Sequence, residues 1–222
     1  MSEGTLYIGN RRYSSWSMRG WLAVKLAGLD VDVQVIQFTR PGTTKAIQDL
    51  SPNGLVPFLV HNGARVWESL AICDYCAELS PGLWPADRVA RAHAKSIAAE
   101  MHAGFRDLRS AMWMALGANF GGLGRTPGAL KDIARIEALW TETRERFGAG
   151  GAFLFGAEFG AADAMFAPVV ARFLLWKPEI SAVSAAYCSA VRTHPLVAEW
   201  YDGAAKEPAD WLIEDYERAP AG

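Results

Sequence analysis

The feature that most constrains the fold is a change of pattern near residue 85. Before this point, short apolar runs alternate with helix-like segments, and after it the apolar residues recur only at helical spacing. The stretch 80–87, which holds two prolines and a glycine, separates the two patterns. The sequence therefore predicts an α/β domain over residues 1–80 and an all-helical domain over residues 88–222.

The first domain alternates strands and helices. An apolar run at 5–8 precedes a helical pattern that reaches residue 26, and the alternation at 31–38 is typical of a half-exposed strand. A short helix is expected over 43–50. Two apolar runs, 57–60 and 64–67, flank an Asn-Gly pair, which is a strong hairpin signal. With a last helix at 70–79, the predicted order is β-α-β-α-β-β-α.

The second domain reads as helix throughout. Apolar residues at steps of three, four or eight predict one long helix from Arg88 to Leu116. A glycine-rich loop over 117–127 follows. The remaining helices are expected at 129–147, 161–175, 185–192 and 196–206.

Composition and charge narrow the class of protein. The 222 residues are 51% hydrophobic, enough to bury a large core. The formal net charge is −2 and the basic residues are scattered, so neither nucleic acid nor an anionic membrane is expected as a partner. No apolar run approaches the roughly 20 residues that span a bilayer, and no cleavable leader pattern opens the chain. Three cysteines, an odd number, suit a reducing compartment. We therefore expect a cytoplasmic protein.

Three serines surround the first turn of the first helix. The free N–H groups and the positive dipole end of a helix make such a turn an anion site, so Ser14, Ser15 and Ser17 are candidates to hold a phosphate, carboxylate or thiolate. The alternative is simple capping, because serine is a preferred N-cap residue. The stretch alone leaves both interpretations open.

Two later stretches carry further candidate residues. Pro57 stands at the start of a strand, where the Val56–Pro57 bond is predicted to be cis and to expose the Val56 backbone; an ordinary trans bond is the commoner alternative. Glu68 and Ser69 open a helix, where a carboxylate and a hydroxyl can hold an ammonium and a carboxylate group, or can merely cap.

Taken together, these stretches resemble the glutathione transferase family over nearly the whole chain. The segment SSWSMRGWLA at 14–23 is similar to the zeta-class SSCSYRVRIAL pattern, NGLVPFL at 53–59 to the cis-proline segment, and ESLAI at 68–72 to the γ-glutamyl-binding helix start. Residues 159–173 resemble the capped, buried helix of the second domain. The resemblance implies a thioredoxin-like first domain and a helical second domain.

The same resemblance implies an activity and its residues. It implies a glutathione transferase with glutathione as co-substrate and no metal, acting in detoxification as a homodimer through residues 69–79 and 88–116. A hydroxyl from Ser14 or Ser15 would stabilise the thiolate; we prefer Ser14, and Tyr13 is a rival. The implied glutathione-binding residues are Trp16, Lys45, Leu55, Val56, Pro57, Glu68 and Ser69, and the implied lining of the electrophile site is Phe105, Met112 and Trp113.

Two departures from the family pattern limit these implications. Trp16 stands where the zeta pattern has cysteine, which weakens the case for zeta-type isomerisation of maleylacetoacetate. Gly160 replaces the usual hydroxyl cap and leaves the capping to Asp163. The alternative class is a non-catalytic protein that keeps this fold for interaction.

Two other groupings suggest chemistry but have simpler interpretations. Cys73 and Cys76 form a C-x-x-C pair, yet they share a helix face with apolar residues and are predicted to pack in the core. His93 and His102 lie nine positions apart on a predicted helix, on opposite sides, so they cannot bind one metal together.

Overall fold

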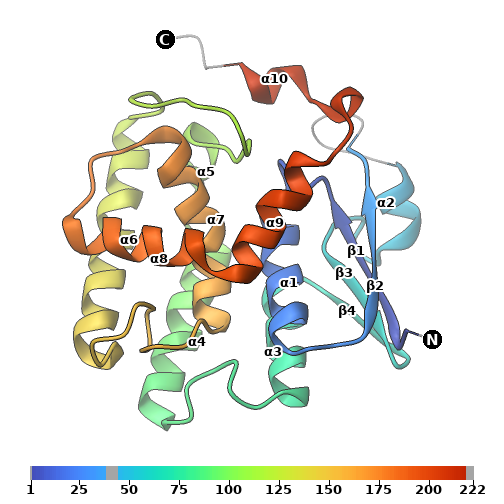
Figure 1. The fold of residues 1–222 in the computed structure, drawn as a ribbon, viewed down its shortest axis with the longest axis horizontal. Helices are drawn as coiled ribbons and strands as arrows, with labels where there is room; N and C mark the ends of the chain where they lie inside the picture. Colours follow the sequence, from blue (N-terminus) through green and yellow to red (C-terminus); the bar gives the residue numbers. More distant parts are fainter. Residues whose placement is uncertain (1, 39–44, 219–222) are drawn as a thin grey trace.

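The computed structural model describes residues 2–38 and 45–218, and a mixed sheet with its helices lies beside a helical bundle (Figure 1). The first part consists of β1 (Gly4–Gly9), α1 (Ser15–Leu26), β2 (Val31–Ile36), α2 (Lys45–Leu50), β3 (Phe58–His61), β4 (Ala64–Trp67) and α3 (Ser69–Leu79). The predicted order of strands and helices is confirmed. The expected start of the second helix at 43–44 lies outside the described residues.

The four strands form one sheet in the order β2-β1-β3-β4. β1 runs parallel to β2 and antiparallel to β3, with Leu6 opposite Leu59. The turn between β3 and β4 has positive φ at Asn62 (47°) and Gly63 (84°), as a two-residue hairpin turn requires. Helices α1 and α3 cover the face of the sheet toward the bundle, and α2 lies on the other side (Figure 1).

The helical part begins after the segment 80–87. It contains α4 (Arg88–Ala103), α5 (Arg106–Ala111), α6 (Pro127–Phe147), α7 (Ala161–Trp176), α8 (Ala182–Thr193), α9 (Pro195–Ala205), the 3-10 turn η1 (Ala209–Trp211) and α10 (Glu214–Glu217). The prediction of a single helix over 88–116 is wrong. Gly104 is extended and Phe105 is left-handed, with φ 58°, so the chain turns between α4 and α5. The apolar spacing continued across this break because both helices bury a face.

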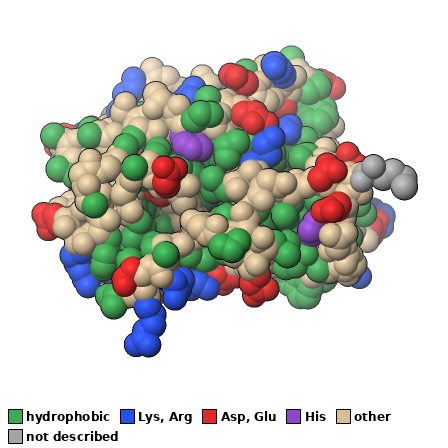
Figure 2. All heavy atoms as spheres, turned by 60° about the horizontal axis from the view of Figure 1, so that its bottom comes forward, with side chains coloured by type: hydrophobic (Ala, Val, Ile, Leu, Met, Phe, Trp, Pro, Cys, Tyr) green, Lys and Arg blue, Asp and Glu red, His purple; other side chains and the backbone are tan. Residues whose placement is uncertain are grey.

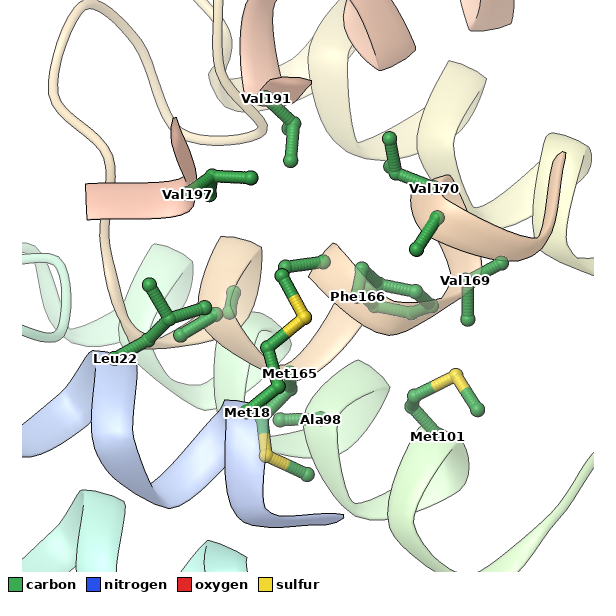
Figure 3. Close-up of a cluster of buried hydrophobic side chains, with 14 of the residues drawn as sticks. Met18, Leu22, Ala98, Met101, Met165, Phe166, Val169, Val170, Val191 and Val197 are labelled. Carbon is green, nitrogen blue, oxygen red and sulfur yellow. The ribbon is translucent and has the colours of Figure 1, made fainter. Parts of the chain in front are cut away.

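Helix α7 is the centre of the molecule, since nearly every residue along it is buried. It packs on α1, where Met18 and Leu22 meet Met165 and Phe166 (Figure 3). Met101 of α4 lies beside the same cluster (Figure 3). This packing fixes the position of α1 relative to the helical part.

The start of α7 is held by one buried carboxylate. Asp163 Oδ2 accepts the backbone N–H of Gly160 at 2.9 Å, and Oδ1 accepts the N–H of Leu154 at 3.1 Å and the Tyr187 hydroxyl at 2.9 Å. The expectation that Asp163 caps this helix in place of a hydroxyl at Gly160 is confirmed.

The end of the described chain crosses back to the loop before α1. The Arg12 guanidinium makes two hydrogen bonds of 2.6 Å to the Glu217 carboxylate, and Glu207 accepts the backbone N–H groups of Arg11 and Arg12. Neither η1 nor α10 was predicted. Together they fix the loop that leads into Ser14.

The remaining sequence expectations on the fold have simple outcomes. Cys73 and Cys76 are free and fully buried, as core packing predicts, and burial raises the pKa of both thiols. Within residues 2–38 and 45–218, no helix is long and apolar enough to cross a membrane.

Candidate active site

Ser14 acts as the N-cap of α1. Its Oγ accepts the backbone N–H of Ser17 at 3.3 Å and donates to Ser17 Oγ at 2.7 Å, while Ser17 Oγ also accepts the N–H of Gly9 at 3.0 Å. The hydroxyl of Ser14 is therefore engaged within the protein as both donor and acceptor. For Ser14, the alternative of simple helix capping is therefore confirmed.

Ser15 has a different environment. Its Oγ accepts a hydrogen bond from Nη2 of Arg172 on α7 at 3.2 Å. Within the described chain, no acceptor takes the hydroxyl proton of Ser15, so that proton is free to point to a ligand. Both serines are 6% exposed.

A pocket of about 480 Å³ lies where the first helix, the proline loop and the end of α4 meet. Its walls come from both parts of the chain: Trp16, Asn53, Leu55, Val56, Pro57, Glu68, Ser69, His102, Ala103, Gly104, Arg106 and Arg109. Six of the seven predicted glutathione-binding residues are among them. The Val56–Pro57 bond is cis, so that prediction is confirmed.

Glu68 and Ser69 form the acidic and hydroxylic wall of this pocket. Glu68 holds a positive φ of 69°, a conformation that non-glycine residues adopt only where the surroundings enforce it. Its carboxylate accepts from Asn53 Nδ2 at 3.1 Å and lies 3.5 Å from His102 Nε2. The Ser69 hydroxyl is buried at the α3 N-terminus and has no partner within the described chain. A carboxylate ligand would supply that partner.

Trp16 forms another wall and lies between two arginines. The Cζ atoms of Arg19 and Arg109 lie 4.6 and 4.4 Å from its ring centroid, and the His102 ring meets it edge-on at 5.2 Å. Burial lowers the pKa of Arg109 to about 10 and that of His102 below its ordinary value. The electrostatics of this wall are cationic.

Other predicted site residues lie outside this pocket. Lys45 is exposed on α2 and faces Asp49 at 3.5 Å. Met112 is fully buried, Phe105 is 7% exposed at the turn between α4 and α5, and Trp113 packs on Phe120, Trp176 and Tyr216. These four residues do not line the pocket, and neither do the predicted catalytic residues Ser14 and Ser15, which lie two positions and one position before the lining residue Trp16.

Tyr13, the rival for the thiol, is directed to the chain's C-terminal segment. Its hydroxyl donates to Glu217 Oε1 at 2.6 Å and accepts the backbone N–H of Ile213 at 3.0 Å. Burial and the neighbouring carboxylate raise its pKa to about 12. A hydroxyl with two partners and this pKa is a poor donor to a third group.

The arginines and His102 are the functional candidates that the sequence interpretation missed. Arg172 interrupts an apolar run on α7, and Arg19 does so on α1, which is a usable signal because an isolated cation in a buried helix needs a reason. Arg106 and Arg109 lie three positions apart just after Gly104, on one face of a short helix. Without the break at Gly104, that face could not be assigned to the pocket.

Two further features do not compete with this pocket. A more open groove of about 640 Å³ lies between β2 and α9, lined by oppositely charged pairs such as Lys25 and Glu199. His93 bonds to Thr143 Oγ1 at 2.8 Å, whereas His102 faces Glu68. No group of three or more metal-binding side chains occurs within the described ranges.

Comparison with known proteins identifies the family. Models of the "Glutathione S-transferase, N-terminal domain" and "Glutathione S-transferase, C-terminal domain" match residues 13–79 and 90–203. The rat protein "Maleylacetoacetate isomerase" is 28% identical over 185 residues, covering 79% of this chain and 81% of its own. A Caenorhabditis elegans protein, "Probable maleylacetoacetate isomerase", is 26% identical over 151 residues, 65% of this chain and 70% of its own.

Solved structures share the fold at lower identity. A glutathione transferase homologue from Burkholderia, with bound glutathione, superposes with a TM-score of 0.69 at 21% identity, covering 92% of this chain and 99% of its own. A theta-class enzyme from Xanthomonas axonopodis pv. citri, also with glutathione bound, gives 0.67 at 21% identity and covers 90% and 98%. The chain belongs to the glutathione S-transferase family and is an enzyme of that type.

Proposed function

We propose that this protein binds glutathione in the 480 Å³ pocket and activates its thiol for conjugation to, or isomerisation of, a small electrophile. The observation that carries the proposal is the unpartnered, buried hydroxyl of Ser69 at the α3 N-terminus, beside the Glu68 carboxylate. This pair is complementary to an amino acid end group, because the hydroxyl and the helix N-terminus favour a carboxylate and Glu68 favours an ammonium.

The rest of the tripeptide would extend along the proline loop. The backbone of Val56 lines the pocket beside Pro57, and Leu55 adds an exposed apolar side chain. The thiol would then lie near the first turn of α1, where the helix dipole and a serine hydroxyl favour the thiolate. Trp16 closes the pocket at that end and restricts the space beside the sulfur.

The names of the curated relatives make maleylacetoacetate the first electrophile to test. Trp16 weighs against simple transfer of that activity, because an indole occupies the position of the cysteine in the zeta pattern. Because Trp16 takes up space in the pocket wall, a small electrophile is a better first candidate than a bulky one.

We also propose a homodimer. Leu79 at the end of α3 and Val89 at the start of α4 are 50% and 60% exposed, and both belong to the segments predicted to form the interface. The face turned forward in Figure 2 carries apolar side chains between charges of both signs, a composition that suits a two-fold interface. Light scattering should give twice the chain mass at micromolar protein.

The test of function is a thermal-shift titration with reduced glutathione. A ligand that binds only the native state stabilises it by RT ln(1 + [L]/Kd), so millimolar glutathione should raise the melting temperature in a saturable way. Ser69→Ala should lose most of this shift. Ser96→Ala is the matched control, since Ser96 is exposed on α4 and its hydroxyl bonds only to Ala92 O.

Two other outcomes are informative. No shift at several millimolar glutathione would favour the alternative, a protein that keeps this fold for interaction only. Lys45→Ala tests the one predicted glutathione-binding residue that does not line the pocket. If the glutathione-induced rise in melting temperature is unchanged, Lys45 does not contribute to binding. If that rise is smaller, the binding site extends to α2.

A further inference from the structure

Three arginines, Arg19, Arg109 and Arg172, form a guanidinium cluster. Arg19 and Arg109 lie over the Trp16 ring, and Arg172 is close enough to both for their charges to repel. Arg19 is fully buried and Arg172 is 5% exposed, and Arg109 lines the pocket itself. The cluster joins three elements, α1, α5 and α7, at the contact between the two parts of the chain.

All the hydrogen bonds of the cluster go to neutral oxygens. Arg19 Nε donates to Met165 O at 2.8 Å, Arg172 Nη1 to Pro168 O at 3.1 Å, and Arg109 Nε to Gly104 O at 3.1 Å. Within residues 2–38 and 45–218, no carboxylate forms a hydrogen bond or ion pair with any of the three. Three buried cations thus lie together without a bound counter-ion, an arrangement that costs several kcal/mol per ion unless an anion compensates it.

Several N–H groups of the cluster also lack acceptors. Both Nη atoms of Arg19, Nη1 of Arg109 and Nε of Arg172 are buried without a partner in the described residues. Burial, and to a smaller extent repulsion from Arg109, lower the pKa of Arg172 to about 9. Free donors and uncompensated positive charge behind the pocket favour an anionic ligand at the Arg109 wall.

We propose that the anion compensated by the guanidinium cluster is the thiolate of bound glutathione. Arg109 contributes its free Nη1 from the pocket wall, and Arg172 polarises the hydroxyl of Ser15, which keeps its proton for the sulfur. The inference rests on the proposed function, because it names the groups that lower the thiol pKa. In this inference Ser15, rather than Ser14, donates the hydrogen bond to the thiolate. Two arginines that no sequence motif suggested, Arg109 and Arg172, add to its stabilisation.

The proposed step is a deprotonation. The S–H bond of glutathione breaks, its electron pair stays on sulfur, and the proton leaves to bulk water. Arg109 would contact the sulfur as a catalytic residue, whereas Arg172 acts through Ser15 and is a positioning residue. Opposite charge within about 4–6 Å lowers a pKa by roughly 1–3 units, more than one neutral hydroxyl donor supplies.

Other charged groups near the pocket modify this effect without replacing it. They lie on the ends of α3 and α4, on α5 and on α6, and are Glu68, His102, Arg106 and Asp132. Asp132 contributes a charge near Arg109 but accepts its hydrogen bond from the Leu108 backbone. Glu68 lies 3.5 Å from His102 Nε2, and the same imidazole meets the Trp16 ring edge-on, so this carboxylate is separated from Trp16 by one side chain.

The experiment is ultraviolet thiolate absorbance against pH for the complex of the full chain with glutathione. In Arg109→Gln the pKa of the bound thiol should rise by about 1–3 units, and in Arg109→Lys by less, because the charge remains. Ser15→Ala and Arg172→Gln should each raise the pKa of the bound thiol. Because Arg172 acts through Ser15, the double variant should raise this pKa by less than the sum of the two single effects. Ser14→Ala should leave it nearly unchanged.

Arg125→Gln is the matched control, since it removes the same charge from an exposed arginine that does not line the pocket. If Arg109→Gln does not fold, Arg172→Gln and Ser15→Ala carry the test. A thiol pKa that rises in Ser14→Ala and not in Ser15→Ala or Arg109→Gln would overturn the inference while the proposed function stands.

Two remaining outcomes separate the inference from the function. If Arg109→Gln leaves the thiol pKa unchanged but raises KM for a carboxylate-bearing electrophile relative to a neutral one, the cluster binds the second substrate and the thiolate assignment is wrong. If the unmutated protein binds glutathione without forming thiolate near neutral pH, the activation step of the proposed function itself fails.

Discussion

Two buried polar centres of this molecule differ in how completely their hydrogen bonds are satisfied. At the start of α7, the Asp163 carboxylate accepts three donors, from Gly160, Leu154 and Tyr187. Nine positions further along the same helix, Arg172 belongs to a cluster with unpartnered N–H groups and no carboxylate partner in the described chain. A satisfied centre stabilises the fold by itself, whereas an unsatisfied one is complete only with a ligand.

The comparison distinguishes a buried polar residue that stabilises the fold from buried polar residues that are available to a ligand. Asp163 and Arg172 are both buried and both have shifted pKa values, so burial and pKa alone do not distinguish the two centres. The hydrogen-bond partners do. The predictions below therefore set the two centres against each other.

The largest expected effect is on the satisfied centre. Asp163→Ala would leave the N–H groups of Gly160 and Leu154 and the Tyr187 hydroxyl buried without an acceptor. Each orphaned group costs about 1–3 kcal/mol, so the free energy of unfolding should fall by roughly 3–5 kcal/mol. Urea denaturation measures it. A loss below 1 kcal/mol would mean that water replaces the carboxylate, and the centre would not be structural.

The second effect is on the pH dependence of stability. Burial raises the pKa of Asp163 from 3.8 to about 6, so the folded state holds this proton more tightly than the unfolded state does. The resulting stability is fully present below pH 4 and is lost as pH rises through about 6, by up to roughly 3 kcal/mol. Unfolding of the unmutated protein and Asp163→Asn should be compared at pH 4–7. A difference that does not change over this range would contradict the raised pKa.

The third prediction is that removing a buried charge from the unsatisfied centre does not destabilise the ligand-free protein. Replacing an uncompensated buried cation by an apolar side chain of similar length is neutral or stabilising, so Arg172→Met should leave the stability of the ligand-free protein unchanged or raise it by about 1–2 kcal/mol. Glutathione should then stabilise the variant less than it stabilises the unmutated protein. A ligand-free loss above 2 kcal/mol would show that Arg172 is structural, and the contrast between the two centres would fail.

Much of the fold was predictable from the sequence because local signals and packing agree. The Asn62-Gly63 turn specifies its hairpin, and α6 begins at Pro127 behind the Thr126 cap. The break at Gly104 was not predictable, because the apolar spacing of α4 continues through α5. The C-terminal η1 and α10 lack an apolar pattern and depend on long-range bonds to Arg12 and Tyr13.

The pocket residues that could be predicted from the sequence are those in the proline loop and at the start of α3. Val56, Pro57, Glu68 and Ser69 carry local motifs, and the structure brings them into one pocket. The guanidinium cluster was not predictable, because its members are 63 or more positions apart and meet only through the packing of α1 on α7. The hydrogen bond of the Ser15 hydroxyl likewise depends on Arg172, far along the chain, whereas Ser14 bonds to nearby Ser17.

The smallest expected effect concerns Tyr13, which links the loop before α1 to the C-terminal segment. Tyr13→Phe removes a hydrogen bond to Glu217 and leaves the backbone N–H of Ile213 without its acceptor. Because the group is only partly buried and Arg12 still holds Glu217, the free energy of unfolding should fall by about 0.5–1.5 kcal/mol. The pKa of bound glutathione should not move, since this hydroxyl is directed away from the pocket. Tyr201→Phe is the matched control, because within the described chain the Tyr201 hydroxyl has no hydrogen-bond partner, and it should change neither quantity. A raised thiol pKa in Tyr13→Phe would return Tyr13 to the active site and show that the C-terminal segment opens when glutathione binds.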